Sequence, residues 1–196
     1  MTTAVDETMK ERLTRCAFEL FSAQGFRDVS LDAIAARAGV TKGAIYAHYQ
    51  SKKDLILDTC QYYYRLWEER MLLRTTDPDP VSRLRQTLLL STEQCLFSES
   101  NRLFTSEIFA MAIQDEEVRN SWGEFFELNR RFYAAMIANV AGKERRPLAS
   151  PEKNAEWLLS VFEGLKQRAL FEPSLADLGQ MGSVVEYLMK IALAGP

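Results

Sequence analysis

The chain has only one histidine and three cysteines among its 196 residues. Cys16, Cys60 and Cys95 lie far apart, each on an apolar helical stripe, which is typical of reduced thiols in the core of a cytoplasmic protein. No two of these side chains are close enough in sequence for a His/Cys zinc motif. A single imidazole, His48, also leaves few ways to build a histidine-based catalytic pair. We therefore expect a protein without metal or cofactor that is not an enzyme.

Long apolar runs are lacking too. None approaches the roughly 18 residues that cross a bilayer, and the segment "MTTAVDETMKERLTR" has no apolar signal-peptide core, so we expect a cytoplasmic protein without membrane contact. The net charge is -3, which excludes a polybasic chain. Residues 1–54 hold 8 Lys/Arg against 7 Asp/Glu, whereas the remainder holds 16 against 20. The N-terminal part is thus the better partner for an anion.

Strand-like alternation is absent, and nearly every segment has the period of a helix. The first helix is expected to end at Gly25, the next two to begin after Ser30 and Thr41, and a fourth to begin after Ser51. Linkers are expected at "TTDPDP" and "GKERRPLASP". The fold class is all-α with about nine helices, the later ones near residues 81–97, 103–113, 118–141, 151–171 and 175–193.

Residues 30–49 have the pattern of a helix-turn-helix. Ala35 is small where two short helices would cross, and Gly39 allows a positive φ in the turn between them. Ile34, Val40 and Ile45 are apolar where the pair must pack on the first helix. In such a motif the second helix enters the DNA major groove. An ordinary αα-hairpin would show the same apolar pattern.

The polar positions of this segment favour DNA. Thr41, Lys42 and Gly43 lie at a helix N-terminus, which attracts phosphate, and Lys42 can reach guanine O6 or N7. Tyr46 and His48 can donate hydrogen bonds to phosphate. The candidate DNA-binding residues are Ser30, Thr41, Lys42, Gly43, Tyr46, His48 and Lys52.

The run "AFELFSAQGFRDVSLDAIAARAGVTKGAIYAHYQSKKDLI" resembles the TetR/AcrR regulators over about forty residues. The resemblance implies that Tyr46, His48 and Lys52 contact phosphate, that Lys42 and Gly43 approach bases, and that Tyr49 is core. It also implies a DNA-binding domain over residues 1–50 and a helical regulatory, ligand-binding and dimerisation domain over 51–196. Such regulators generally repress transcription as homodimers on double-stranded operator DNA and leave it when a small molecule binds. Ala47 occupies a position that varies in the family, which leaves the operator sequence open.

Two apolar stripes near the end of the sequence predict a homodimer. A two-fold dimer would explain how one short reading helix serves a palindromic operator. Both stripes could instead cover the protomer's own core. The candidate interface residues are Trp157, Val161, Phe162, Gly164, Leu165, Val185, Leu188 and Met189.

Aromatic residues with a few polar neighbours predict a site for an apolar or aromatic effector. Asn129 interrupts an apolar face and Glu107 borders another, although both could simply tie helices together. A cationic effector would use Glu107, and an anionic one would need Arg102 or Arg130 turned inward. The candidate ligand residues are Tyr63, Trp67, Phe97, Phe104, Glu107, Trp122, Phe125, Phe126, Asn129 and Tyr133.

Two other classes of function stay open at this stage. One is a helical adaptor or small-molecule-binding protein that does not regulate through DNA. The other is a carboxylate-based enzyme, because 27 acidic residues make chance carboxylate pairs inevitable. DNA binding that weakens with salt would distinguish the regulator from both.

Overall fold

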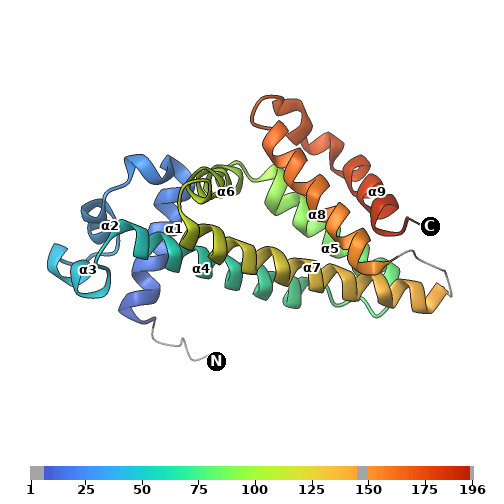
Figure 1. The fold of residues 1–196 in the computed structure, drawn as a ribbon, viewed down its shortest axis with the longest axis horizontal. Helices are drawn as coiled ribbons and strands as arrows, with labels where there is room; N and C mark the ends of the chain where they lie inside the picture. The colour runs from blue at the N-terminus through green and yellow to red at the C-terminus, as the bar shows by residue number, and fades with distance from the viewer. Residues whose placement is uncertain (1–6, 145–149, 195–196) are drawn as a thin grey trace. The chain divides into compact units, whose positions relative to one another are not determined.

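The computed structural model describes residues 7–144 and 150–194. Within these ranges the chain forms nine α-helices and no strand, which confirms the predicted all-α fold (Figure 1). No helix in these ranges is both long and apolar enough to cross a membrane. The helices are α1 (Met9–Asp28), α2 (Leu31–Arg37), α3 (Lys42–His48), α4 (Lys52–Arg74), α5 (Pro80–Thr92), α6 (Glu99–Ala112), α7 (Glu116–Glu144), α8 (Pro151–Arg168) and α9 (Met181–Ala192), with short η1 (Glu93–Phe97), η2 (Pro173–Ala176) and η3 (Leu178–Gln180) segments.

The described residues pack into two compact units. One combines the described part of Met1–Trp67 with Leu103–Ser121, and the other combines Glu68–Arg102 with the described part of Trp122–Pro196. We refer to them as unit 1 and unit 2 and describe each by itself. They are defined by packing, whereas the predicted division at residue 50 concerns function, and that division stays a prediction.

Helix α1 does not end at Gly25, as predicted, but is interrupted there. Gly25 adopts φ 80° and ψ 168°, and the chain then resumes a last helical stretch to Asp28. The carboxylate of Glu107 on α6 accepts the backbone N–H of Phe26 at 3.2 Å, which satisfies a donor that the interruption exposes. The prediction that the helix ends at Gly25 is therefore wrong, although the chain does leave helical geometry at this residue.

Unit 2 is built around α5, α8 and α9. Helix α5 packs on α9, and α9 also packs on α8, so that these helices lie side by side in Figure 1. Leu84, Leu88, Leu158 and Leu188 form the centre of this packing and are at most 1% exposed. The apolar faces of these helices therefore serve the core of the protomer itself.

Three other predicted boundaries are corrected. The helix expected to run to residue 97 is α-helical only to Thr92. The next five residues, Glu93–Phe97, form the π-helix η1. Helix α8 ends at Arg168, before the predicted residue 171, and turns lead through η2 and η3 to α9. In the expected second linker, Lys143 belongs to α7, whereas Arg145 and Arg146 lie outside the described residues.

Candidate nucleic-acid interface and ligand sites

A tight turn joins α2 to α3 in unit 1. Gly39 has φ 66°, the left-handed conformation that favours glycine. Its N–H donates to the carbonyl of Ala36 at 3.1 Å, and the N–H of Val40 donates to the carbonyl of Ala35 at 3.0 Å. The turn thus satisfies the backbone groups at the end of α2 and redirects the chain into α3.

Side-chain caps fix where the two short helices begin. The hydroxyl of Ser30 accepts the N–H of Ala33 at 3.1 Å, and that of Thr41 accepts the N–H of Ala44 at 3.3 Å. Both caps agree with the sequence prediction. The hydroxyl oxygens of Ser30 and Thr41 thus already accept backbone N–H groups. A hydroxyl that also contacts a phosphate would have to keep this capping bond while it donates its own hydrogen.

Helix α3 has one buried face and one open face. Ile45 is fully buried, and Tyr49 just beyond the helix is 2% exposed, with its hydroxyl 3.1 Å from that of Thr14. Tyr49 therefore lies in the core, as predicted. Lys42, Gly43, Tyr46 and His48, by contrast, are exposed. The α3 residues predicted to meet DNA therefore share a solvent-facing surface, which is the geometry that reading a major groove requires.

An acidic residue belongs to the same surface. The carboxylate of Asp32 on α2 lies 2.7 Å from Nζ of Lys42, and this ammonium group is 5.8 Å from the ring centre of Tyr46. The hydrogen bond to Asp32 raises the pKa of Lys42, so the lysine stays cationic. Sequence reasoning missed this pair, since ten residues and a turn separate its members.

Lys52 begins α4 close to the same motif. Its Nζ donates to the carbonyl of Arg27 at 3.3 Å. Partial burial lowers the pKa of Lys52, against the opposing pull of the Asp28 and Glu107 carboxylates. Lys52 is less exposed than Lys42, and it would have to extend further to reach a phosphate.

In unit 1, the predicted ligand residues pack into an aromatic cluster. The rings of Tyr63 and Phe104 are 5.5 Å apart, and Phe104 also contacts Phe18 and Phe26. The carboxylate of Glu107 is turned to the backbone of Phe26, as described above. Trp67 is 5% exposed. These contacts agree with the alternative interpretation, in which the residues build core, and their role in ligand binding stays a prediction.

In unit 2, a second group of predicted ligand residues lies along α7. The ring of Trp122 is 5.1 Å from that of Phe125 and 6.2 Å from that of Phe126. Asn129 is buried and donates to the Phe125 carbonyl of its own helix at 2.8 Å. The hydroxyl of Tyr133 lies 2.5 Å from that of Ser91, and burial raises its pKa. Phe97, the remaining member in unit 2, is partly exposed in η1.

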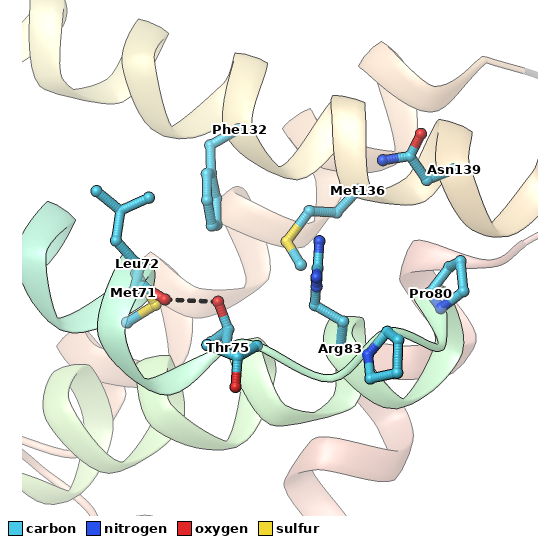
Figure 2. Close-up of a pocket in the computed structure, with 10 residues that line it drawn as sticks. Met71, Leu72, Thr75, Pro80, Arg83, Phe132, Met136 and Asn139 are labelled. Carbon is cyan, nitrogen blue, oxygen red and sulfur yellow. Dashed lines mark hydrogen bonds between the residues drawn. The ribbon is translucent and has the colours of Figure 1, made fainter.

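A cavity of about 510 Å³ lies elsewhere in unit 2 (Figure 2). It lies between the end of α4, the linker that follows, the start of α5 and the middle of α7. None of its lining residues belongs to the predicted ligand set. Two stretches far apart in the sequence, 71–83 and 132–139, contribute to it, so no single helical stripe could have indicated it. The lining residues are Met71, Leu72, Thr75, Thr76, Pro78, Pro80, Arg83, Phe132, Met136 and Asn139.

The predicted dimer residues divide into two groups. Phe162, Val185, Leu188 and Met189 are at most 6% exposed and fill the core of the protomer. The others lie toward solvent: Trp157 is 66% exposed, Gly164 has nothing within 4 Å of the space a Cβ would take, and Val161 and Leu165 are partly exposed. Tyr187 on α9, which the prediction omitted, is 65% exposed. An apolar surface thus remains on this part of unit 2.

Known proteins provide an independent view of these sites. Residues 13–59 match the family model described as bacterial regulatory proteins, tetR family. The chain is 44% identical over 187 residues to the HTH-type transcriptional regulator SrpR of Pseudomonas putida, covering 94% of this chain and 84% of SrpR. It is 32% identical over 155 residues to the HTH-type transcriptional repressor BepR of Brucella suis biovar 1 (strain 1330), covering 78% and 74%.

Other likenesses are shorter or more distant. The uncharacterized HTH-type transcriptional regulator YerO of Bacillus subtilis (strain 168) is 37% identical over 62 residues, so the match spans 32% of this chain and only 22% of YerO. Among solved structures, a SmeT–triclosan complex has a similar fold, with a TM-score of 0.71, 22% identity and coverage of 93% of this chain and 90% of that one. The curated relatives are named as transcriptional regulators, which agrees with the prediction that the chain is not an enzyme.

Proposed function

Because this chain belongs to the tetR family of bacterial transcriptional regulators, we propose that it represses transcription as a homodimer on a palindromic operator and leaves the DNA when a small apolar or aromatic effector binds. The observation that carries this proposal is the open face of α3. Lys42, Gly43, Tyr46 and His48 are solvent-facing there, while Ile45 anchors the helix from behind. An ordinary αα-hairpin has no need to gather hydrogen-bond donors on such a face.

The chemistry of each side chain on this surface indicates whether it would contact bases or phosphates. Lys42 and the backbone at Gly43 lie at the start of α3, where a side chain can reach base edges, so they would carry sequence preference. Tyr46, His48 and Lys52 would donate to phosphates and set the register of the protein on the duplex. Phosphate contacts release counterions, and binding should therefore weaken as salt rises.

A homodimer would make two copies of this short helix act together. The exposed Trp157 and Tyr187, with the partly exposed Val161 and Leu165, offer an apolar surface on α8 and α9 that a second copy could cover. Gly164 would let the facing backbone approach closely, since nothing in the protomer fills the space beside it. A two-fold axis through this surface would match a palindromic operator.

The repressor role and the effector are supported more indirectly. BepR is named as a repressor, and one of the structures similar to this chain in fold is a SmeT complex with triclosan. Within this chain, the aromatic rings of both units and the cavity of unit 2 supply apolar surroundings for a small molecule.

The test is DNA binding to the region upstream of the protein's own gene, measured by fluorescence anisotropy at two salt concentrations. We expect a complex whose affinity falls steeply between about 50 and 200 mM salt. An adaptor without DNA binding would bind this duplex no better than it binds an unrelated duplex. An exchange of two exposed donors of α3, Lys42→Ala with Tyr46→Phe, should abolish the preference for the upstream region.

A further inference from the structure

The cavity of unit 2 has the dimensions of a small-molecule site. About 510 Å³ lies within the range of roughly 300–1,000 Å³ that ligand pockets occupy. Its floor is apolar, because Met71 is 1% and Met136 is 9% exposed, whereas Leu72 at its border is 68% exposed. Figure 2 shows Phe132 and Met136 reaching toward it from α7. Apolar side chains thus share the lining with polar ones, and the site is open to solvent at its edge.

Arg83 is the only charged side chain among the ten that line this cavity. Its Nε donates to the backbone carbonyl of Asp77 at 2.8 Å, which fixes the plane of the guanidinium. No hydrogen bond or ion pair with another described residue uses its two terminal nitrogens. Figure 2 shows the side chain extending from α5 toward Met136 on α7. The anchored group therefore presents two unused donors beside an apolar wall.

The two acidic side chains of the linker that precedes α5 are engaged elsewhere. Asp79 forms an ion pair with Lys143, which lowers the pKa of this carboxyl to about 2, and its other oxygen accepts the N–H of Ser82 at the start of α5. The carboxylate of Asp77 accepts the N–H of Asp79 at 2.9 Å. Neither carboxylate is bound to the guanidinium of Arg83, so its charge is left for a ligand.

These features specify the chemistry of a ligand. A planar guanidinium with two parallel donors fits a carboxylate, or an oxyanion such as a phenolate, better than it fits any neutral group. Methionine and phenylalanine side chains make favourable contacts with aromatic rings. The amide of Asn139 and the hydroxyl of Thr76 at the border can accept or donate further hydrogen bonds. A cation would instead be repelled by Arg83.

We propose that the cavity binds an aromatic compound with one anionic group, its rings against Met71, Phe132 and Met136 and its carboxylate or phenolate on Arg83. The proposal rests on the proposed function in one respect, since it names the chemical class of the effector. It also changes the sequence-based expectation. Glu107, expected to hold a cation, is bound to backbone, and Arg130, one of two arginines considered for an anion, is paired with Glu127.

The test uses three probes with one skeleton: biphenyl-4-carboxylate, biphenyl-4-carboxamide and biphenyl-4-methylammonium. Calorimetric titration of the full-length protein should give the carboxylate the lowest Kd, by about tenfold, because a charge-assisted bond is stronger than a neutral one. Arg83→Gln should raise the Kd of the carboxylate by about tenfold and leave that of the carboxamide nearly unchanged. Arg131→Gln removes the same charge from an exposed position of α7 outside the cavity and should change neither.

Three results would overturn the proposal: no binding of the carboxylate at millimolar concentration, a preference for the methylammonium probe, or equal loss of carboxylate affinity in Arg83→Gln and Arg131→Gln. Operator release is measured separately, by anisotropy with labelled DNA. A carboxylate that binds through Arg83 without releasing DNA supports the site and contradicts its role as effector site. DNA binding without any probe binding contradicts the site and leaves the regulator intact.

Discussion

The carboxylate of Asp32 and the ammonium group of Lys42 form an ion pair of 2.7 Å across the helix-turn-helix. Both side chains are more than half exposed, so the pair is screened by water and contributes little to folding. Its effect is on where Lys42 points. A lysine held by Asp32 must exchange this partner for a base edge or a phosphate when DNA arrives, and Asp32 itself repels any phosphate nearby.

Lys42→Ala should weaken binding to the preferred operator by about tenfold to a hundredfold and relax the sequence preference, because a base contact is lost. Asp32→Asn should instead strengthen binding to unrelated DNA. The affinity should rise by about threefold to tenfold, because one charge that repels phosphate disappears. Anisotropy titrations with operator and unrelated duplexes check both. Glu124→Gln, which removes an exposed carboxylate from α7, is the control. Equal behaviour of Asp32→Asn and Glu124→Gln would contradict the role of the pair.

Tyr46→Phe and Lys52→Ala should weaken binding to operator and unrelated DNA by similar factors, because both residues are assigned to phosphate. Removing the Lys52 charge should also reduce the slope of log K against log salt by about one, while Tyr46→Phe should leave the slope unchanged. The measurement is a salt titration of each variant. A change in operator preference for Lys52→Ala would show that this residue reads bases.

Gly25 is expected to tolerate substitution less well than Gly39. An alanine at Gly25 would adopt φ 80°, ψ 168°, a region almost restricted to glycine, and its Cβ would lie 3.1 Å from a Glu107 oxygen. Gly25→Ala should lower the free energy of unfolding by about 2–3 kcal/mol, and Gly39→Ala, whose Cβ meets nothing within 4 Å, by about 1 kcal/mol. Gly123→Ala, in the helical and open part of α7, should stabilise slightly. Urea unfolding ranks the three, and a milder effect at Gly25 than at Gly39 refutes the argument.

Cys60 provides a prediction about pH. Burial raises the pKa of its thiol to about 12, above the value of roughly 8.5 in an unfolded chain. The unfolded state therefore loses this proton first as the pH rises, and stability falls from about pH 9 upward. The parent should lose about 2 kcal/mol more than Cys60→Ala between pH 8 and pH 10. Unfolding by urea at the two values measures this difference, and parallel curves for the two proteins would contradict it.

Trp157→Asp should convert the dimer, which has twice the chain mass of 22.4 kDa, into a monomer. Operator binding should weaken as a consequence. The reason is that the exposed indole lies on the surface assigned to the partner copy, where a carboxylate would be buried without a counter-charge. Ile113→Asp, at a position 78% exposed in unit 1, should change neither property. Light scattering after size exclusion gives the masses. A parent that is monomeric at micromolar concentration would contradict the dimer outright.

The sequence predicted those parts of the fold that depend on short-range signals. Ser30 and Thr41 cap helices where expected, and Gly39 takes the positive φ that a turn requires. Gly25 shows the limit of such reasoning. The sequence indicated a break at this residue, but the helix continues beyond it, where the N–H of Phe26 donates to the carboxylate of Glu107, 81 residues away along the chain.

The candidate sites divide in the same way. The open face of α3 follows from helical period, because Lys42 and Tyr46 are four residues apart and Ile45 faces inward. The partner of Lys42 and the cavity beside Arg83 do not follow from any period. Each depends on residues from different segments that only the folded chain brings together.

The most direct test of the central claim is selection of DNA from a random library of duplexes by the parent protein. We predict enrichment of an inverted repeat, with half-sites about one helical turn apart, whose affinity falls with salt. The Lys42→Ala variant should select a more degenerate repeat with the same spacing, since the dimer is intact but a base contact is missing. Recovery of no common sequence by the parent, or of the identical repeat by Lys42→Ala with Tyr46→Phe, would contradict the assignment of α3 as the reading helix.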